Sequence, residues 1–286
     1  MKTSNIIKSF LAFSMIMFLY SCNVIDKPYE DSVSPIDTTG TTVQNAKNIL
    51  LEDYTGFNCP NCPKAVAEIE ALKAIYGDRL ITVSVHAGYF AQPSSSDAAF
   101  SYDFRTQAGV QWNNMFGIAE YPSGLINRTG VNEQTHILAP GAWGERATGI
   151  AAQNADMTIK ITSKYTDGAS SIGADVDVEF LNESETKYYL SVILVQDNIV
   201  DTQNNAGQIV TDYVHNHVLR GAFNSTWGEE LNTSTVVKGD KFSKSVSIDI
   251  KNDTVHPWDP ANMKIIAFVY DADTYEVMQA AQINVK

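Results

Sequence analysis

The sequence contains few cysteines, few basic residues and no long apolar segment. Its 286 residues include three Cys, and 20 Lys and Arg against 33 Asp and Glu, so the formal net charge is -13. Nucleic acid is excluded as a partner, because no Lys/Arg cluster is present to displace counterions from phosphates. No second hydrophobic stretch approaches 18 residues, so we expect a mature chain that does not span a membrane. The composition is that of a globular protein, with 44% hydrophobic residues.

The first 21 residues have the features of a signal peptide. A short basic segment precedes an apolar run at 10–20 (FLAFSMIMFLY), which is too short to cross a bilayer as a helix. The run leads into Ser21-Cys22, which resembles the lipobox of bacterial lipoproteins. We therefore expect cleavage before Cys22 and attachment to a membrane through lipid on that cysteine. The alternative is an ordinary signal peptide with a cysteine close to its cleavage site.

The remaining chain divides into three segments by composition. Residues 22–44 are polar and rich in Ser, Thr, Asp and Pro, which predicts a flexible tether. Residues 45–155 mix apolar strand patterns with helical patterns, and 156–286 contain strand patterns without a strong helix. We therefore expect two folded domains with a boundary near residue 155.

The two remaining cysteines, Cys59 and Cys62, are only three positions apart. A disulfide that closes so short a loop adds about 2 kcal/mol by chain entropy, against about 4.7 kcal/mol for a 100-residue loop. The pair is therefore better suited to chemistry than to stapling the fold. At a helix start we expect Cys59 to be an exposed attacking thiolate and Cys62 to be the more buried resolving thiol. A vestigial disulfide and a metal site are the alternatives, although no second cysteine pair is present.

The segment around the cysteines predicts a strand, a Cys-x-x-Cys turn, a helix and a second, parallel strand. Residues 47–54 and 80–86 have strand patterns, and apolar residues in 63–77 recur at helical spacing. A helical connection makes the two strands parallel. Residues 87–116 are expected to form a largely helical insertion.

Alternating apolar residues predict a β-sandwich after residue 156. Ala174, Val176 and Val178 alternate with acidic residues, as expected for a strand with one buried face. Several such strands over about 130 residues favour an immunoglobulin-like sandwich. The predicted strands are 157–165, 172–180, 187–196, 242–250, 263–270 and 277–285.

The first folded segment resembles the thioredoxin superfamily. The likeness rests on Cys59-Pro60-Asn61-Cys62, on Asp53 six residues earlier, and on the Gly-Ile segment that leads into Tyr121-Pro122. It implies that Asp53 deprotonates the resolving cysteine and that the Tyr121–Pro122 bond is cis and faces the sulfurs. It also implies a substrate groove at Pro60, Asn61 and Tyr121. Asn58 stands where thioredoxins have Trp before the first cysteine. A solvated acid is the alternative for Asp53.

Roughly residues 45–286 also resemble the outer-membrane-protein-28-related lipoproteins of Bacteroidetes-type bacteria. The likeness is carried by 51–56 (LEDYTG) leading into 59–63 (CPNCP), by 121–128 (YPSGLINR) and by 213–220 (YVHNHVLR). It implies a thioredoxin-like α/β domain followed by an all-β immunoglobulin-like sandwich. It also implies an outer-membrane address, with the periplasmic and surface faces both open.

These observations favour a lipid-anchored envelope thiol–disulfide oxidoreductase without a cofactor, acting on envelope proteins that carry thiols or disulfides. A surface binding or adhesion lipoprotein, in which the fold is only a scaffold, is the main alternative. A metal-binding protein with His86 as a third ligand is another, although His86 is also interpreted as a polar strand end. His215 and His217 would share one strand face, where a structural role is favoured over a metal site. Three tryptophans are interpreted as core residues, Trp143, Trp227 and Trp258.

Overall fold

The computed structural model describes residues 45–286, which form mixed β-sheets and a small number of helices. The helices are α2 (Cys62–Tyr76), α3 (Gln107–Met115) and α4 (Trp143–Ala151). The strands of the first half are β1 (Ile49–Thr55), β2 (Leu80–His86) and β3 (Ser123–Ile126). The remaining strands are β4 (Met157–Ser163), β5 (Ser171–Phe180), β6 (Tyr188–Gln196), β7 (Ile199–Asn205), β8 (Gln208–His215), β9 (Val218–Ala222), β10 (Glu229–Glu230), β11 (Lys241–Asp249), β12 (Met263–Asp271) and β13 (Val277–Asn284).

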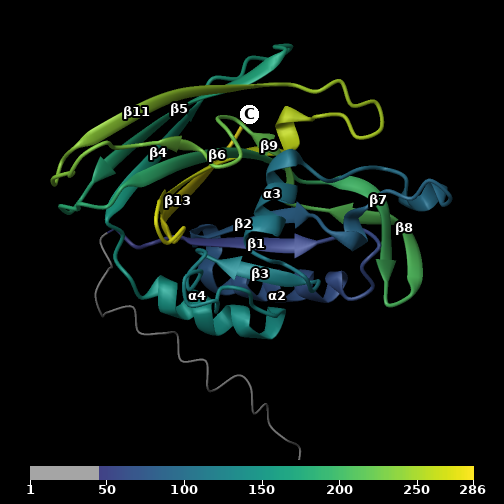
Figure 1. Cartoon of the computed structure of the whole chain (residues 1–286). Helices are drawn as coiled ribbons and strands as arrows, with labels where there is room; N and C mark the ends of the chain where they lie inside the picture. Colours follow the sequence, from purple (N-terminus) through teal and green to yellow (C-terminus); the bar gives the residue numbers. More distant parts are fainter. Residues whose placement is uncertain (1–44) are drawn as a thin grey trace, which may run out of the picture. The chain divides into compact units, whose positions relative to one another are not determined.

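Within residues 45–286, one eight-stranded sheet joins both halves of the chain. Its order is β13-β12-β6-β9-β2-β1-β3, with β10 paired to β6. The pairs β1–β2 and β2–β9 are parallel, and the other pairs along this path are antiparallel. β1 and β2 lie side by side in this sheet (Figure 1). Both are buried along their whole length, although β1 includes Glu52 and Asp53.

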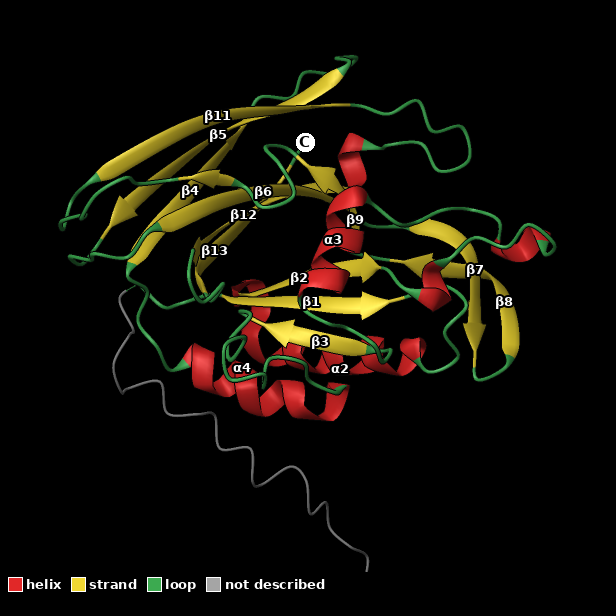
Figure 2. Cartoon of the chain, in the orientation of Figure 1, coloured by secondary structure: helices red, strands yellow, loops and turns green. Residues whose placement is uncertain are grey.

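The eight-stranded sheet curls until its first and last strands meet. The N–H of Val277, at the start of β13, donates to the carbonyl of Asn127, just after β3. The inner face of the curl holds one apolar core, to which α3 contributes Trp112. α3 lies against this inner face (Figure 2). The curvature therefore encloses a core that a flat sheet would leave open to solvent.

Two different layers cover the outer face of the sheet. At the β1–β2–β3 end, α2 and α4 pack through residues such as Leu72 and Trp143. At the β6–β12–β13 end, the separate sheet β11-β5-β4 packs through the alternating apolar residues of β5. The alternation of β5 is therefore explained by one face on this core and one face in solvent.

The predicted fold class, a thioredoxin-like α/β domain followed by an immunoglobulin-like sandwich, is wrong. β1, β2 and β3, expected in the first domain, share a sheet with β6, β12 and β13 because β9 joins β2 to β6. Only β4, β5 and β11 of the predicted sandwich strands form a second sheet. The strands themselves and the helix after the cysteines are confirmed. The error arose because alternation shows which side of a strand is buried and not which strands pair.

β7 and β8 form a separate two-stranded hairpin beside the cysteine end of the main sheet. The shared face expected for His215 and His217 requires one continuous strand through both, and the chain does not form it, because β8 ends at His215 and β9 begins at Val218. Between them His217 has φ +58°, a left-handed conformation that breaks the strand. His215 and His217 therefore do not share one strand face.

The predicted signal peptide, the lipidation site Cys22 and the tether lie outside the described residues. Among residues 45–286, no helix combines the length and apolar character needed to cross a membrane.

Candidate functional site

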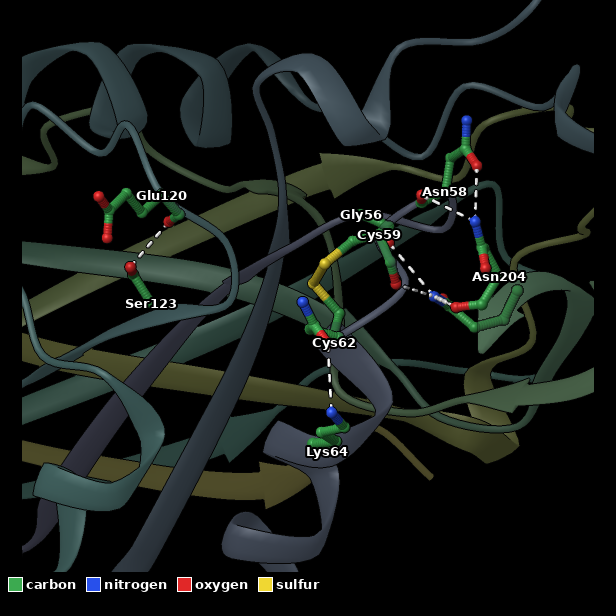
Figure 3. Close-up of a disulfide and its surroundings, with 10 residues drawn as sticks. Gly56, Asn58, Cys59, Cys62, Lys64, Glu120, Ser123 and Asn204 are labelled. Atoms are coloured by element: carbon green, nitrogen blue, oxygen red, sulfur yellow. Dashed lines mark hydrogen bonds between the residues drawn. A yellow bond between two sulfur atoms is a disulfide. The ribbon is translucent and has the colours of Figure 1, made fainter. Parts of the chain in front are cut away.

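Cys59 and Cys62 form a disulfide at the start of α2, with their Cα atoms 5.4 Å apart (Figure 3). The loop leaves β1 through Gly56, and the N–H of Cys59 donates to the Gly56 carbonyl at 3.0 Å. A Cβ atom on Gly56 would lie 2.5 Å from the backbone carbonyl of Phe90. Only glycine fits this close approach, so the chain can turn here directly from the strand into the disulfide loop.

Both cysteines are buried, which corrects the expectation that Cys59 is exposed. Their exposed fractions are 1% for Cys59 and 3% for Cys62. The β7–β8 hairpin covers the loop, and the Gln203 Nε2 donates to the Cys59 carbonyl at 3.0 Å. The N–H of Ala206, at the hairpin turn, donates to the Pro60 carbonyl at 2.9 Å. Local sequence could not reveal this cover because the hairpin lies about 140 residues further along the chain.

Asp53 lies on β1, on the face that points toward α2, and only 2% of it is exposed. Its Oδ1 atom has no hydrogen-bond partner. Burial raises the pKa of the Asp53 carboxyl to about 7, because a charged carboxylate is poorly solvated there. The alternative of a solvated acid is therefore wrong, and the carboxyl can gain or lose a proton near neutral pH.

A cavity of about 40 Å³ joins Asp53 to Cys62. That volume has room for a water molecule between polar groups. The cavity is also lined by α2 and by the ends of β2 and β8, among them His86, Tyr213 and His215. Burial and, secondly, the Asp53 carboxylate raise the pKa of the Tyr213 phenol. The carboxyl and the disulfide therefore belong to one polar site.

Two buried histidines form the far wall of this cavity. The rings of His86 and His215 lie 5.6 Å apart, and Phe104 contacts both. Burial and the neighbouring His215 hold the pKa of His86 well below its usual value, and burial lowers that of His215 to about 4. Both imidazoles are therefore neutral at pH 7. Across residues 45–286, no group of three or more His, Cys, Asp or Glu side chains is arranged to hold a metal ion.

The proline segment lies at the same end of β1 as the disulfide. Tyr121–Pro122 is cis, which confirms the predicted isomer. Ser123 pairs with Tyr54, so Pro122 stands where the chain leaves β1 toward the cysteines. Glu120 and Ser123 lie on one side of the disulfide and Asn204 on the other (Figure 3). The thioredoxin resemblance also implies that Pro122 belongs to the catalytic residues and shapes the groove for the substrate, and this role stays a prediction.

The residues predicted to line a substrate groove are not all brought together. Pro60 is partly exposed and Asn61 is exposed, both in the disulfide loop. Tyr121 points elsewhere, donating its hydroxyl to Asn113 Oδ1 at 2.5 Å. Sequence reasoning missed Gln203, and no local signal marks it, because its importance comes only from long-range packing.

The opposite face of β1 carries a second buried carboxylate, which is fully paired. Glu52 accepts two hydrogen bonds from Arg128, at 2.8 and 2.7 Å. The Arg128 guanidinium also lies 4.9 Å from the ring centres of Phe116 and Phe268. This arrangement satisfies both charges, so it is a structural pair inside the curled sheet.

The fold and the site define a β-rich protein with one helical layer and a buried short-loop disulfide beside an unpaired carboxyl. Residues 110–286 match the family model of Outer membrane protein Omp28. The chain belongs to this family, which associates it with the outer membrane. The matched region includes Pro122 and the β7–β8 hairpin, and it begins after Asp53 and the cysteines.

Solved structures include similar chains. HBP35 of Porphyromonas gingivalis is 19% identical over 84% of this chain and 76% of its own, with a TM-score of 0.64, which shows a shared fold. A domain of the outer membrane lipoprotein Omp28 from the same organism is 26% identical, over 46% of this chain and 89% of its own, with a TM-score of 0.34. A protein of Agrobacterium tumefaciens is 12% identical, over 85% and 96%, with a TM-score of 0.49. No curated protein matches the chain.

Proposed function

We propose that the chain is a lipid-anchored envelope protein that exchanges disulfides with other envelope proteins through Cys59 and Cys62. The observation that carries the proposal is the Asp53 carboxyl, which is buried, unpaired and in the same cavity as Cys62. Leaving a buried polar atom unpaired costs about 1–3 kcal/mol, so a structural role does not account for Asp53. A proton acceptor with a pKa of about 7 suits thiol chemistry at neutral pH.

The exchange runs in two balanced steps from the reduced protein. The Cys59 thiolate attacks one sulfur of a partner disulfide, forming a mixed disulfide and releasing the partner's other sulfur as a thiolate. The Cys62 thiol then gives its proton to the Asp53 carboxylate and attacks the Cys59 Sγ. This step restores the Cys59–Cys62 disulfide and releases the second partner thiolate. The partner gains two electrons, and the reverse steps oxidise a partner dithiol.

The buried sulfurs require the hairpin to move before a partner can react. Six hydrogen bonds tie it to the loop. Gln203 Nε2 donates to the carbonyls of Gly56 and Cys59, and Asn204 Nδ2 donates to the carbonyl and the Oδ1 of Asn58. The backbone N–H groups of Asn204 and Ala206 donate to the carbonyls of Phe57 and Pro60. Each contributes about 1 kcal/mol net, and Ile199 of β7 packs in one apolar cluster with Phe57, so opening costs several of these contacts together. Attack on Cys59 therefore follows displacement of this cover.

Insulin reduction by dithiothreitol tests the proposed exchange in the soluble mature chain, with turbidity as the readout. The wild-type chain should accelerate the reaction, and Cys59→Ser and Cys62→Ser should abolish the acceleration. Asp53→Asn should slow it about ten-fold or more at pH 7, because general base catalysis contributes at least that factor. The matched control is Asp78→Asn, because Asp78 is fully exposed in the turn that follows α2. The opposite direction is measured as oxidation of a reduced substrate protein. If the wild-type chain accelerates neither insulin reduction nor this oxidation, the oxidoreductase proposal is excluded.

A binding lipoprotein with a permanent disulfide is the second candidate, favoured by the burial of both sulfurs. In that case glutathione buffers should fail to reduce the disulfide, and the folded chain should still bind its partner molecules with the disulfide intact. Alkylation of the cysteines with a maleimide after equilibration in glutathione separates the two candidates.

Attachment through Cys22 predicts incorporation of labelled fatty acid in cells, which Cys22→Ala should remove.

A further inference from the structure

The outer edge of β8 is open. Within residues 45–286, β8 pairs only with β7, and the two strands form their own sheet. Figure 2 shows β8 as the outer strand of this hairpin. The other strand is already engaged with the body of the protein, since the Asn204 N–H of β7 donates to the Phe57 carbonyl. The unpaired N–H and C=O groups of β8 are therefore a template for another strand.

The side chains along this edge also favour pairing. Val214 is 45% exposed and Ile209 is 50% exposed, and Val200, the cross-strand partner of Val214, is 55% exposed. Natural edge strands are usually guarded by Lys, Pro or a bulge that turns the edge away. β8 has the sequence QIVTDYVH, with neither Lys nor Pro. The β7–β8 ladder shifts register once, between Asp201 and Gln203. An eight-residue, β-branched edge without Lys or Pro is suited to an extended partner.

One end of the β8 edge lies beside the cavity that Cys62 lines. The cavity beside Cys62 is lined on one side by α2 and on the other by Tyr213, Val214 and His215 of β8. A strand laid along β8 would thus pass the opening of the cavity that holds Cys62. The hairpin that such a strand extends is the same one that covers Cys59.

The charges around the edge select the partner. Residues 199–217 contain no Lys or Arg. They contain Asp212 and Asp201, whose carboxylate is hydrogen-bonded to His256, and Glu70 of α2 lines the cavity. Extended segments with basic side chains complement this surface, while acidic segments are repelled.

We infer that β8 binds an extended, cationic segment of a cysteine-containing partner by β-strand addition, which presents the partner's sulfur to the disulfide. The recognition is mainly through main-chain hydrogen bonds, so it accepts many sequences. This inference rests on the proposed function for its purpose, but binding at β8 needs no redox chemistry.

Fluorescence anisotropy tests this binding independently of redox chemistry. The probe is a labelled nine-residue peptide in which Val and Thr alternate, with Lys at both ends and a central Ser. The protein is the mature chain with Cys59→Ser and Cys62→Ser, so neither component can exchange sulfur. Val214→Lys and, separately, Ile209→Lys should weaken binding about ten-fold or more, and raising the salt should also weaken it. Val237→Lys is the matched control, because Val237 is 50% exposed outside the hairpin.

A second probe keeps the test independent of protein folding. The same peptide with alternate backbone nitrogens methylated on one edge cannot complete a ladder and should bind at least ten-fold more weakly. Equal binding of the two peptides, or full binding to both Lys variants, would overturn the inference. Insulin turnover without peptide binding would leave the oxidoreductase standing and reject the β8 edge. Peptide binding without insulin turnover would support the β8 edge as a binding site and reject the oxidoreductase.

Discussion

Glu52 and Asp53 are neighbours on β1, both buried, yet their surroundings differ completely. Glu52 points into the curled sheet, where Arg128 neutralises it with two hydrogen bonds. Asp53 points the other way, toward α2, with one oxygen unpaired beside the cavity and the disulfide. The difference teaches that burial alone does not define a functional carboxyl. The paired acid stabilises the fold, while the unpaired acid lowers its stability and is the proton acceptor that we propose.

Among changes near Glu52 or Asp53, removal of Arg128 should lower the free energy of unfolding the most. Arg128→Met leaves Glu52 charged and buried without a partner, so we expect a loss of about 3–5 kcal/mol in the free energy of unfolding. Urea denaturation at pH 7 measures it. The double variant Glu52→Gln/Arg128→Met should regain most of the loss. Lys241→Met, which breaks an exposed pair with Glu179, should cost at most about 1 kcal/mol. An equally small cost for Arg128→Met would contradict the structural role.

Asp53→Asn should stabilise the protein, with a defined pH dependence. Because the pKa rises from 3.8 to about 7, the folded state holds a proton that the unfolded state has lost between these values. The free energy of unfolding therefore falls by up to about 4 kcal/mol as the pH rises from about 4 to 7, and it stays at the lower value above pH 7. Asparagine avoids this loss, so the variant should be more stable at pH 8 and nearly equal at pH 4. Denaturation at both values checks this, and a stability gain that does not depend on pH would refute it.

Gly56→Ala should have a smaller effect, confined to the cysteine side. The added Cβ would meet the Phe90 backbone at 2.5 Å, and such overpacking costs about 1–3 kcal/mol. Thermal denaturation measures the change. Gly141→Ala is the matched control, since nothing lies within 4 Å of its added Cβ. Equal melting temperatures for the two variants would show that the loop adjusts freely.

Much of the local structure was predictable from the sequence. The apolar spacing after Cys62 gave α2, and alternation gave β5 and β11, because these patterns report burial of one face. The fold class was not predictable in the same way. β9 is five residues long and carries no distinctive pattern, yet its pairing with β2 and β6 merges the two expected domains into one sheet.

The candidate site was also only partly predictable. Asp53 and the cysteines lie within ten residues of each other, so a strand followed by a helix places them together. The burial of Cys59 depends on Gln203, and the cavity wall depends on Tyr213 and His215. These residues come from a hairpin whose docking is a long-range packing event. Exposure of a side chain is therefore the property that local patterns predict least well here.

The most direct test compares the rate of reduction of the Cys59–Cys62 disulfide by dithiothreitol in the wild-type chain and in Asp53→Asn between pH 5 and 9. Both proteins share the titration of the reagent, so the ratio of the two rates isolates Asp53. The ratio should change by about ten-fold or more, with a midpoint near pH 7, where the Asp53 carboxyl titrates. A ratio that stays constant over the whole range would show that this carboxyl does not act on the disulfide.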